Sequence, residues 1–174
     1  MNIKMKLLLT CLVATAAAPV FAATPAKSNT GGFDVVTCSF DADGGFNFCT
    51  NKAYATYKKL ASKKNINFDQ KYVLINLKNP LPGSTTEYRH NFVAVDPASK
   101  KVFPFPFTVY DENMSKNIKV SVSSKTNALC MPSSYHADSS KEISSYGGLN
   151  SKKKMCFEFA PGSIHNFVTM PTYK

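Results

Sequence analysis

Beyond residue 70 the chain alternates between apolar and polar positions, which is the period of β-strands with one buried face. Residues 72–77 form an apolar run, residues 88–96 and 102–110 alternate, and turns containing Pro, Gly or Asp separate these segments. Further short strands are expected at residues 118–123, 127–131, 155–159 and 165–170. The pattern predicts a mainly antiparallel β-sheet.

One amphipathic helix is expected in the N-terminal part of the domain, at residues 50–64. Apolar side chains recur there at helical spacing, at Ala53, Tyr54, Tyr57, Leu60 and Ala61. Thr50 or Asn51 can cap its start, while Lys63 and Lys64 suit the negative end of the helix dipole. A helix packed on a mainly antiparallel sheet gives the fold class α+β.

Two segments depart from the simple strand pattern. Pro104 and Pro106 lack a backbone N–H on the same side of the strand at residues 102–110, which places that strand at an edge or end of the sheet. Residues 132–154 are rich in Ser, Lys, Tyr and Gly and have no periodicity. They are expected to form a long loop that is either mobile or functional.

The N-terminus has the order of residue types of a cleavable signal peptide. Lys4 and Lys6 precede an apolar run at residues 7–18, Pro19 interrupts it, and small residues before Ala22 predict cleavage after that residue. The apolar run is too short to span a bilayer, so no transmembrane anchor is expected in the mature form.

The signal peptide, residues 1–22, predicts a periplasmic or secreted protein. Residues 23–32 are polar and are expected to form a disordered leader. Residues 33–174 have the length of a single domain that can bury its own core.

Four cysteines remain after cleavage, Cys38, Cys49, Cys130 and Cys156, and in an exported chain they predict two disulfides. Asp43-Gly44 is a hairpin signal, and counting outward from that turn places Cys38 opposite Cys49. Cys130 would then pair with Cys156 by elimination. No Cys-x-x-Cys pair is present and no histidine adjoins a cysteine, so neither a metal site nor a cofactor is expected.

The chain is basic, with a formal net charge of +10. Without the two lysines of the signal peptide, nineteen basic and eleven acidic side chains leave +8. Arg89 is the sole arginine, and lysine lacks the planar fork used to read base edges. The charge therefore favours an anionic surface or an acidic partner protein over specific nucleic-acid recognition.

Residues 96–107, Asp-Pro-Ala-Ser-Lys-Lys-Val-Phe-Pro-Phe-Pro-Phe, resemble the Asp-x-x-Thr-Gly-Lys-Val-Tyr-x-x-Pro hairpin of small exported bacterial proteins. The resemblance covers only this hairpin and implies a bacterial periplasmic setting. Asp96 and Ser99 are expected to bond the local backbone of the turn. Lys100 stands where that pattern has Gly, so either Lys100 adopts a left-handed conformation or the turn differs.

Two function classes fit these observations. The first is a protein-binding module, an inhibitor or immunity-type protein that acts on a secreted or cell-wall-directed enzyme and has another exported protein as its partner. Aromatic anchors are typical of interfaces, and the candidates are Phe103, Phe105, Phe107 and Tyr110. Core packing is the alternative for Phe103, Phe105 and Phe107, because alternate residues of a strand share a face.

The second class is a small secreted metal-free hydrolase of ribonuclease type. Its candidate catalytic residues are His90 and His165, each of which begins a His-Asn-Phe-Val tetrapeptide. If the two strands were neighbours, the histidines could form an acid–base pair. No established catalytic motif is present, so the binding module is preferred, and a purely structural envelope protein is a third class.

Overall fold

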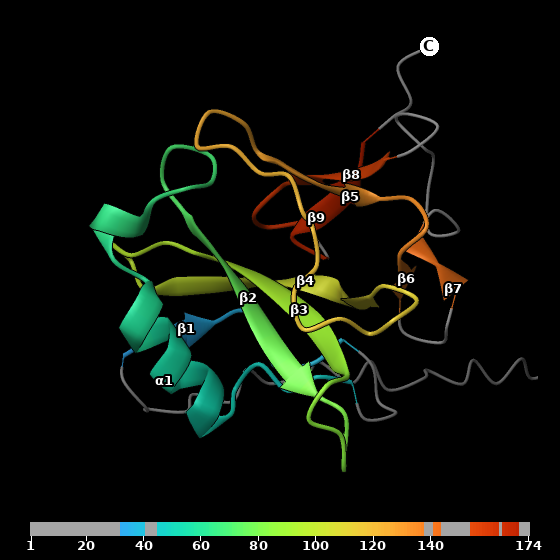
Figure 1. The fold of residues 1–174 in the computed structure, drawn as a ribbon. Helices are drawn as coiled ribbons and strands as arrows, with labels where there is room; N and C mark the ends of the chain where they lie inside the picture. Colours follow the sequence, from blue (N-terminus) through green and yellow to red (C-terminus); the bar gives the residue numbers. More distant parts are fainter. Residues whose placement is uncertain (1–31, 41–44, 138–140, 144–153, 164, 171–174) are drawn as a thin grey trace, which may run out of the picture.

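The computed structural model describes residues 32–40, 45–137, 141–143, 154–163 and 165–170. The expected signal peptide and nearly all of the expected leader lie outside the described residues. The described chain forms two β-sheets and one α-helix (Figure 1). Within these residues no helix is long and apolar enough to cross a membrane.

The larger sheet, called the main sheet, has the strand order β2-β3-β4-β6-β7, and β1 pairs with β4 beside this path. Its strands are β1 (Asp34–Val35), β2 (Val73–Pro80), β3 (Tyr88–Val95), β4 (Lys101–Tyr110), β6 (His136–Ala137) and β7 (Lys141–Glu142). The β1–β4 pair is parallel and the other pairs are antiparallel. The main sheet is therefore mixed, where the sequence predicts mainly antiparallel pairing.

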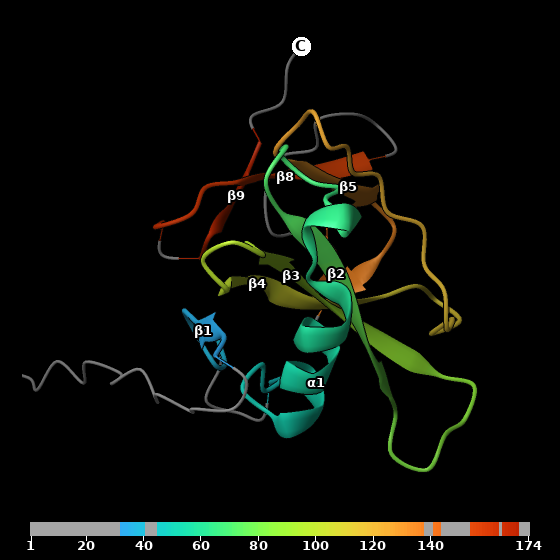
Figure 2. The ribbon, with the colours of Figure 1, turned by 90° about the vertical axis from the view of Figure 1, so that its left-hand side faces the viewer.

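A second, small sheet consists of three antiparallel strands in the order β5-β8-β9. They are β5 (Ala128–Pro132), β8 (Lys154–Phe159) and β9 (Phe167–Thr169). The rings of Phe105 in β4 and Phe157 in β8 lie 4.9 Å apart, so the small sheet packs against one face of the main sheet. Figure 2 shows the small sheet and the helix α1 at opposite ends of the molecule.

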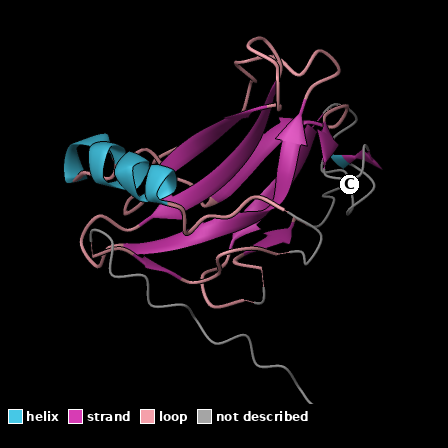
Figure 3. Cartoon of the chain, turned by 90° about the horizontal axis from the view of Figure 1, so that it is seen from below, coloured by secondary structure: helices cyan, strands magenta, loops and turns pink. Residues whose placement is uncertain are grey.

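The helix α1 spans Asn51–Leu60, and Thr50 caps its start by accepting a hydrogen bond from the Ala53 amide. Figure 3 shows α1 beside the strands. The predicted extension to residue 64 is wrong, because the chain leaves the helix at Ala61 and then makes a short 3-10 helix, Lys63–Asn65. Lys58 and Lys59, not Lys63 and Lys64, occupy the last turn of α1.

Two apolar cores lie on the two faces of the main sheet. The helix-side core joins α1 to the strands through Phe33, Val35, Phe48, Ala53, Tyr54, Tyr57, Val73, Ile75, Leu77, Val93, Val95 and Val102. The aromatic core, between the main sheet and the small sheet, contains nine aromatic rings among its buried side chains: Phe68, Tyr72, Phe92, Phe103, Phe105, Tyr135, Phe157, Phe159 and Phe167. Alternate residues of β3 enter opposite cores, as the strand period requires.

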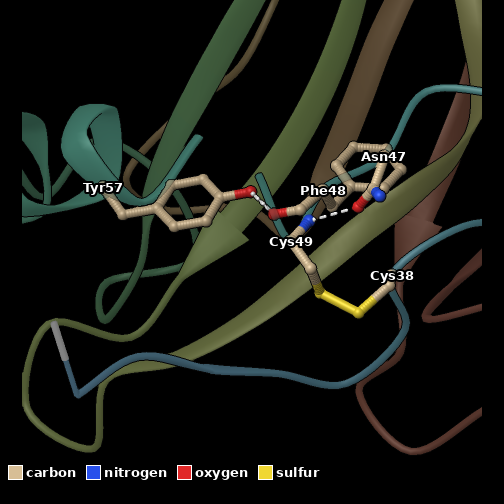
Figure 4. Close-up of a disulfide and its surroundings, with 5 residues drawn as sticks. All are labelled: Cys38, Asn47, Phe48, Cys49 and Tyr57. Atoms are coloured by element: carbon tan, nitrogen blue, oxygen red, sulfur yellow. Dashed lines mark hydrogen bonds between the residues drawn. A yellow bond between two sulfur atoms is a disulfide. The ribbon is translucent and has the colours of Figure 1, made fainter. Parts of the chain in front are cut away.

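Both predicted disulfides are present. Cys38 bonds Cys49, and Cys130 bonds Cys156 across the paired strands β5 and β8. Figure 4 shows the first of them next to α1, where the Tyr57 hydroxyl donates to the Phe48 carbonyl. The N-terminal segment is thereby fastened to the helix-side core.

The strand pair predicted around the first disulfide does not form. The segment at residues 33–40 contributes only β1, which pairs in parallel with β4, and residues 45–50 contain no strand. The Phe48 amide donates to the Cys38 carbonyl at 2.8 Å, which keeps the two cysteines adjacent. The tip of the expected turn, residues 41–44, lies outside the described residues.

Pro104 and Pro106 lie in the middle of β4, and the prediction of an edge strand is correct only locally. The carbonyls of Lys100 and Val102 accept hydrogen bonds from Asp34 in β1 and from Val36 just after it, so the two prolines, at alternate positions after them, also face that side. β1 ends before them and β6 begins after them, at the register of Val109. The missing donors therefore fall in a gap between two partner strands.

The turn after β3 has the expected hydrogen bonds. Asp96 accepts from the amides of Ala98 at 2.9 Å and Ser99 at 3.3 Å, and from the Ser99 hydroxyl at 2.8 Å. Lys100 has φ 57°, so of the two predicted alternatives the structure shows the first, a non-glycine residue in the left-handed conformation.

Two predictions for the C-terminal half need correction. Residues 118–123 form no strand and contribute a single bridge between Ser121 and Cys130. The expected loop at residues 132–154 contains β6 and β7, which extend the main sheet, and Ile143 is fully buried. Residues 138–140 and 144–153 of that loop lie outside the described residues.

Candidate binding surface

The aromatic residues predicted as binding anchors lie mostly in the interior. Phe103, Phe105 and Tyr110 are 9%, 0% and 4% exposed, and Phe107 is half-buried against the aromatic core. The Phe105 ring contacts four other rings, those of Phe92, Phe107, Phe157 and Phe167. These side chains pack the protein itself and present little surface to a partner.

The two candidate catalytic histidines are in different surroundings. His90 is a fully buried residue of β3, which pairs with β2 and β4. His165 is exposed just before β9, which pairs with β8, and its ring lies 5.9 Å from that of Phe40. The structure does not bring the two imidazoles together.

Both ring nitrogens of His90 are engaged by the protein. Nε2 lies 2.8 Å from the Ser115 carbonyl, which can only accept, so Nε2 carries the proton and donates it. Nδ1 then accepts from the side-chain amide of Asn76, whose nitrogen is 3.0 Å away. Burial lowers the pKa of His90, Lys78 lowers it further, and the Ser115 bond and Asp111 oppose this. The residue is a neutral, internally bonded histidine.

A groove of about 470 Å³ lies between α1 and β2. We call it the α1–β2 groove. It is lined by Phe46, Thr50, Lys52, Ala53, Thr56, Asn76, Leu77, Lys78 and Asn79. Its helix side is supplied by the first two turns of α1, which pack beside β2 (Figure 2). The groove combines apolar side chains with amides, hydroxyls and two lysines, the mixture that ligand and protein interfaces use.

The α1–β2 groove is electropositive. Lys52 and Lys78 are exposed, and no described carboxylate lies within ion-pair distance of either. Lys78 Nζ donates to Asn117 Oδ1 at 2.6 Å, a neutral acceptor that leaves its charge uncompensated. The first turn of α1 contains no acidic residue, so the positive end of the helix dipole adds to the two lysines.

A second groove, of about 460 Å³, lies between the segment after β1 and the turn before β9. Val36, Lys101, Phe103 and Ser163 are among its lining residues, and Val36 is 37% exposed. The Ser163 hydroxyl is buried and has no hydrogen-bond partner within the described chain. Among the described residues, Phe103 is thus a predicted anchor that lines a surface hollow of this size.

Sequence reasoning did not single out the residues of the α1–β2 groove. From the sequence, Lys52 is expected on the solvent-exposed face of a helix, and Lys78 is expected at the end of a strand. Their proximity depends on how α1 packs beside β2, which no local pattern encodes. The free charge on both sides of the groove therefore becomes visible only in the fold.

No family model, curated protein or solved structure matches the chain. The described residues contain no group of three or more His, Cys, Asp or Glu side chains placed to hold a metal ion.

Proposed function

We propose that this protein is an exported binding module of inhibitor or immunity type, which recognises another exported protein through the α1–β2 groove. The expected target is a secreted or cell-wall-directed enzyme. The groove is the observation that carries the proposal, because it joins an apolar floor to two lysines without a described carboxylate partner.

The chemistry of the groove suits a protein partner. Phe46, Ala53 and Leu77 supply apolar contact surface, while Lys52 and Asn79 supply polar groups. Protein interfaces combine an apolar centre with a polar rim in this way. The net charge of the chain, +8 after the proposed cleavage, raises the association rate with an acidic partner.

Export supports the choice of an exported partner. The proposed signal peptide at residues 1–22 would deliver the chain to the periplasm or the exterior, where the disulfides Cys38–Cys49 and Cys130–Cys156 persist. Both disulfides hold segments that border the two cores. A surface on a domain held rigid by two disulfides loses little conformational entropy on binding.

The test is affinity capture with the mature protein, residues 23–174, as bait in periplasmic and secreted extracts. Lys52→Glu reverses a charge in the groove, and Lys59→Glu makes the same change on α1 outside the groove. We expect the wild type and Lys59→Glu to retain one stoichiometric protein and Lys52→Glu to lose it. Equal capture by both variants would place the interface elsewhere, and no capture by the wild type would contradict the binding function.

A further inference from the structure

The outer side of β2 is a strand edge. β2 is the terminal strand of the main sheet, and its register with β3 is unbroken, so every second residue turns its N–H and C=O away from β3. The Leu74 amide shows which residues these are, because it donates to Asn67 Oδ1 at 2.8 Å and not to β3. Asn76 and Lys78 follow at alternate positions and share this orientation.

Within the described chain these outward backbone groups are free to bind a partner. No described residue forms a hydrogen bond with the backbone N–H or C=O of Asn76 or Lys78. We call the outer edge of β2 between Leu74 and Pro80 the open stretch. It ends at these two residues, because Asn67 Oδ1 already bonds the Leu74 amide and Pro80 has no N–H. The same stretch lines the α1–β2 groove. An extended chain lying in the groove would find donors and acceptors at strand spacing.

We infer that the partner binds as an added β-strand on the outer edge of β2, through a short, extended, acidic segment. The inference rests on the proposed function, because the segment occupies the same groove. In strand addition the main-chain hydrogen bonds provide affinity, and alternate side chains provide specificity. Here one side of the added strand meets Ala53 and Lys52 of α1, and the other meets the side chain of Lys78.

The acidic character follows from the charges that flank the edge. Lys52 and Lys78 lie on the two sides of the open stretch, and neither has a carboxylate partner within the described chain. Asp or Glu at alternate or adjacent positions of the added strand would pair with them in a site partly shielded from water.

A second copy of this chain fits the edge less well than an acidic partner. Pairing two β2 edges would bring lysines of like charge together, and lysine and proline on an edge are devices that oppose self-association. Pro80 also limits the ladder to a short stretch. The edge is therefore restricted in length and selective by charge.

The test separates the backbone donor from the side chain at one position. Lys78→Pro removes the outward N–H, whereas the matched variant Lys78→Ala removes the charge and keeps the N–H. The Lys78 amide is not used by the main sheet, so both variants should fold, which circular dichroism and thermal unfolding check. The probes are ten-residue peptides selected by display on the mature protein and then synthesised.

We expect the selected peptides to be enriched in Asp, Glu and β-branched residues. Lys78→Pro should weaken their binding at least about tenfold relative to Lys78→Ala, because it removes a main-chain hydrogen bond and closes the edge sterically. On binding, the amides of Asn76 and Lys78 should become protected from hydrogen exchange, while the Leu77 amide, which faces β3, should change little.

Three results would overturn the inference: no selected peptide, equal binding by the two Lys78 variants, or unchanged exchange at Asn76 and Lys78. The proposed function fails separately. If Lys52→Glu abolishes capture of an exported protein but Lys78→Pro does not, the groove binds a partner without strand addition. If peptides bind the edge but no exported protein is captured, the edge is functional and the proposed target class is wrong.

Discussion

The Tyr57 hydroxyl donates a buried hydrogen bond of 2.9 Å to the backbone carbonyl of Phe48 (Figure 4). This bond joins α1 to the segment that the Cys38–Cys49 disulfide closes. Burial, with a smaller contribution from Tyr54, raises the pKa of Tyr57, so the hydroxyl keeps its proton and continues to donate in mildly alkaline solution. The packing of the N-terminal segment on α1 therefore depends on one side-chain donor.

Tyr57→Phe should lower the free energy of unfolding by about 1–2 kcal/mol, because the Phe48 carbonyl loses its buried donor. The measurement is urea unfolding followed by circular dichroism. Tyr54→Phe is the matched control on the same helix, since no described residue bonds the Tyr54 hydroxyl. A loss of equal size in both variants would show that removing a tyrosine hydroxyl from this helix, and not breaking the bond to Phe48, is responsible.

Asp96→Asn should remove an acid-sensitive part of the stability. Burial alone would raise the pKa of Asp96, but hydrogen bonds from Lys71, Ser99 and the Ala98 amide outweigh it and lower the pKa to about 2. A lowered carboxyl pKa gives stability that is complete above the ordinary value of 3.8 and disappears as the pH falls toward 2.

The wild type should exceed Asp96→Asn by about 1–2 kcal/mol at neutral pH, a figure reduced for the solvent exposure of Lys71. The difference should shrink between about pH 4 and pH 2. Urea unfolding across this range measures it, and Asp34→Asn, at an exposed position of β1, is the control. A difference that stays constant with pH would contradict the linkage.

His90→Gln should flatten the pH dependence of stability. Because burial lowers the pKa of His90, the unfolded chain takes up more protons than the folded chain below the ordinary value of 6.5. The wild type should therefore lose stability as the pH falls from 7 to 5, and the variant should lose less. Urea midpoints give the comparison. His165→Gln, at an exposed position, is the control and should retain the slope of the wild type. A flattened slope in this control would show that His90 is not the source of the pH dependence.

Phe105→Ala should cost about 3–5 kcal/mol of unfolding free energy, the range for a large ring removed from a packed core. Phe105 is 0% exposed, whereas the half-buried Phe107 should cost less when replaced by alanine. Thermal or urea unfolding measures both. If Phe107→Ala kept full stability but abolished partner capture, the interface would include the aromatic side chains of β4, as the sequence predicted.

Local patterns in the sequence predicted the central elements well. The Thr50 cap and the spacing of Ala53, Tyr54 and Tyr57 define α1. The apolar run of β2 and the alternation along β3 and β4 give their pairing through short connections. Counting from the Asp43-Gly44 turn gave the Cys38–Cys49 bond, although the strands expected around it are absent. Adjacent cysteines need only a reversal of the chain, not a hairpin.

The errors concern contacts between distant segments. β1 pairs in parallel with β4, although more than sixty residues separate them in the sequence. A strand of two residues has no periodicity from which this pairing could be predicted. Residues 118–123 have strand composition, yet their pairing with β5 is limited to the bridge between Ser121 and Cys130, on the side of β5 that β8 leaves free. The α1–β2 groove has the same origin, since its walls come from elements that meet only after folding.

The gap in β4 at Pro104 and Pro106 has a consequence for the behaviour of the protein at high concentration. A foreign strand that reached this gap would meet carbonyl oxygens with no N–H groups between them, so it could form only half of a ladder. Fibre growth needs a complete ladder at every added strand. The two prolines, of which Pro104 is itself buried, thus make the break between β1 and β6 unable to seed polymerisation.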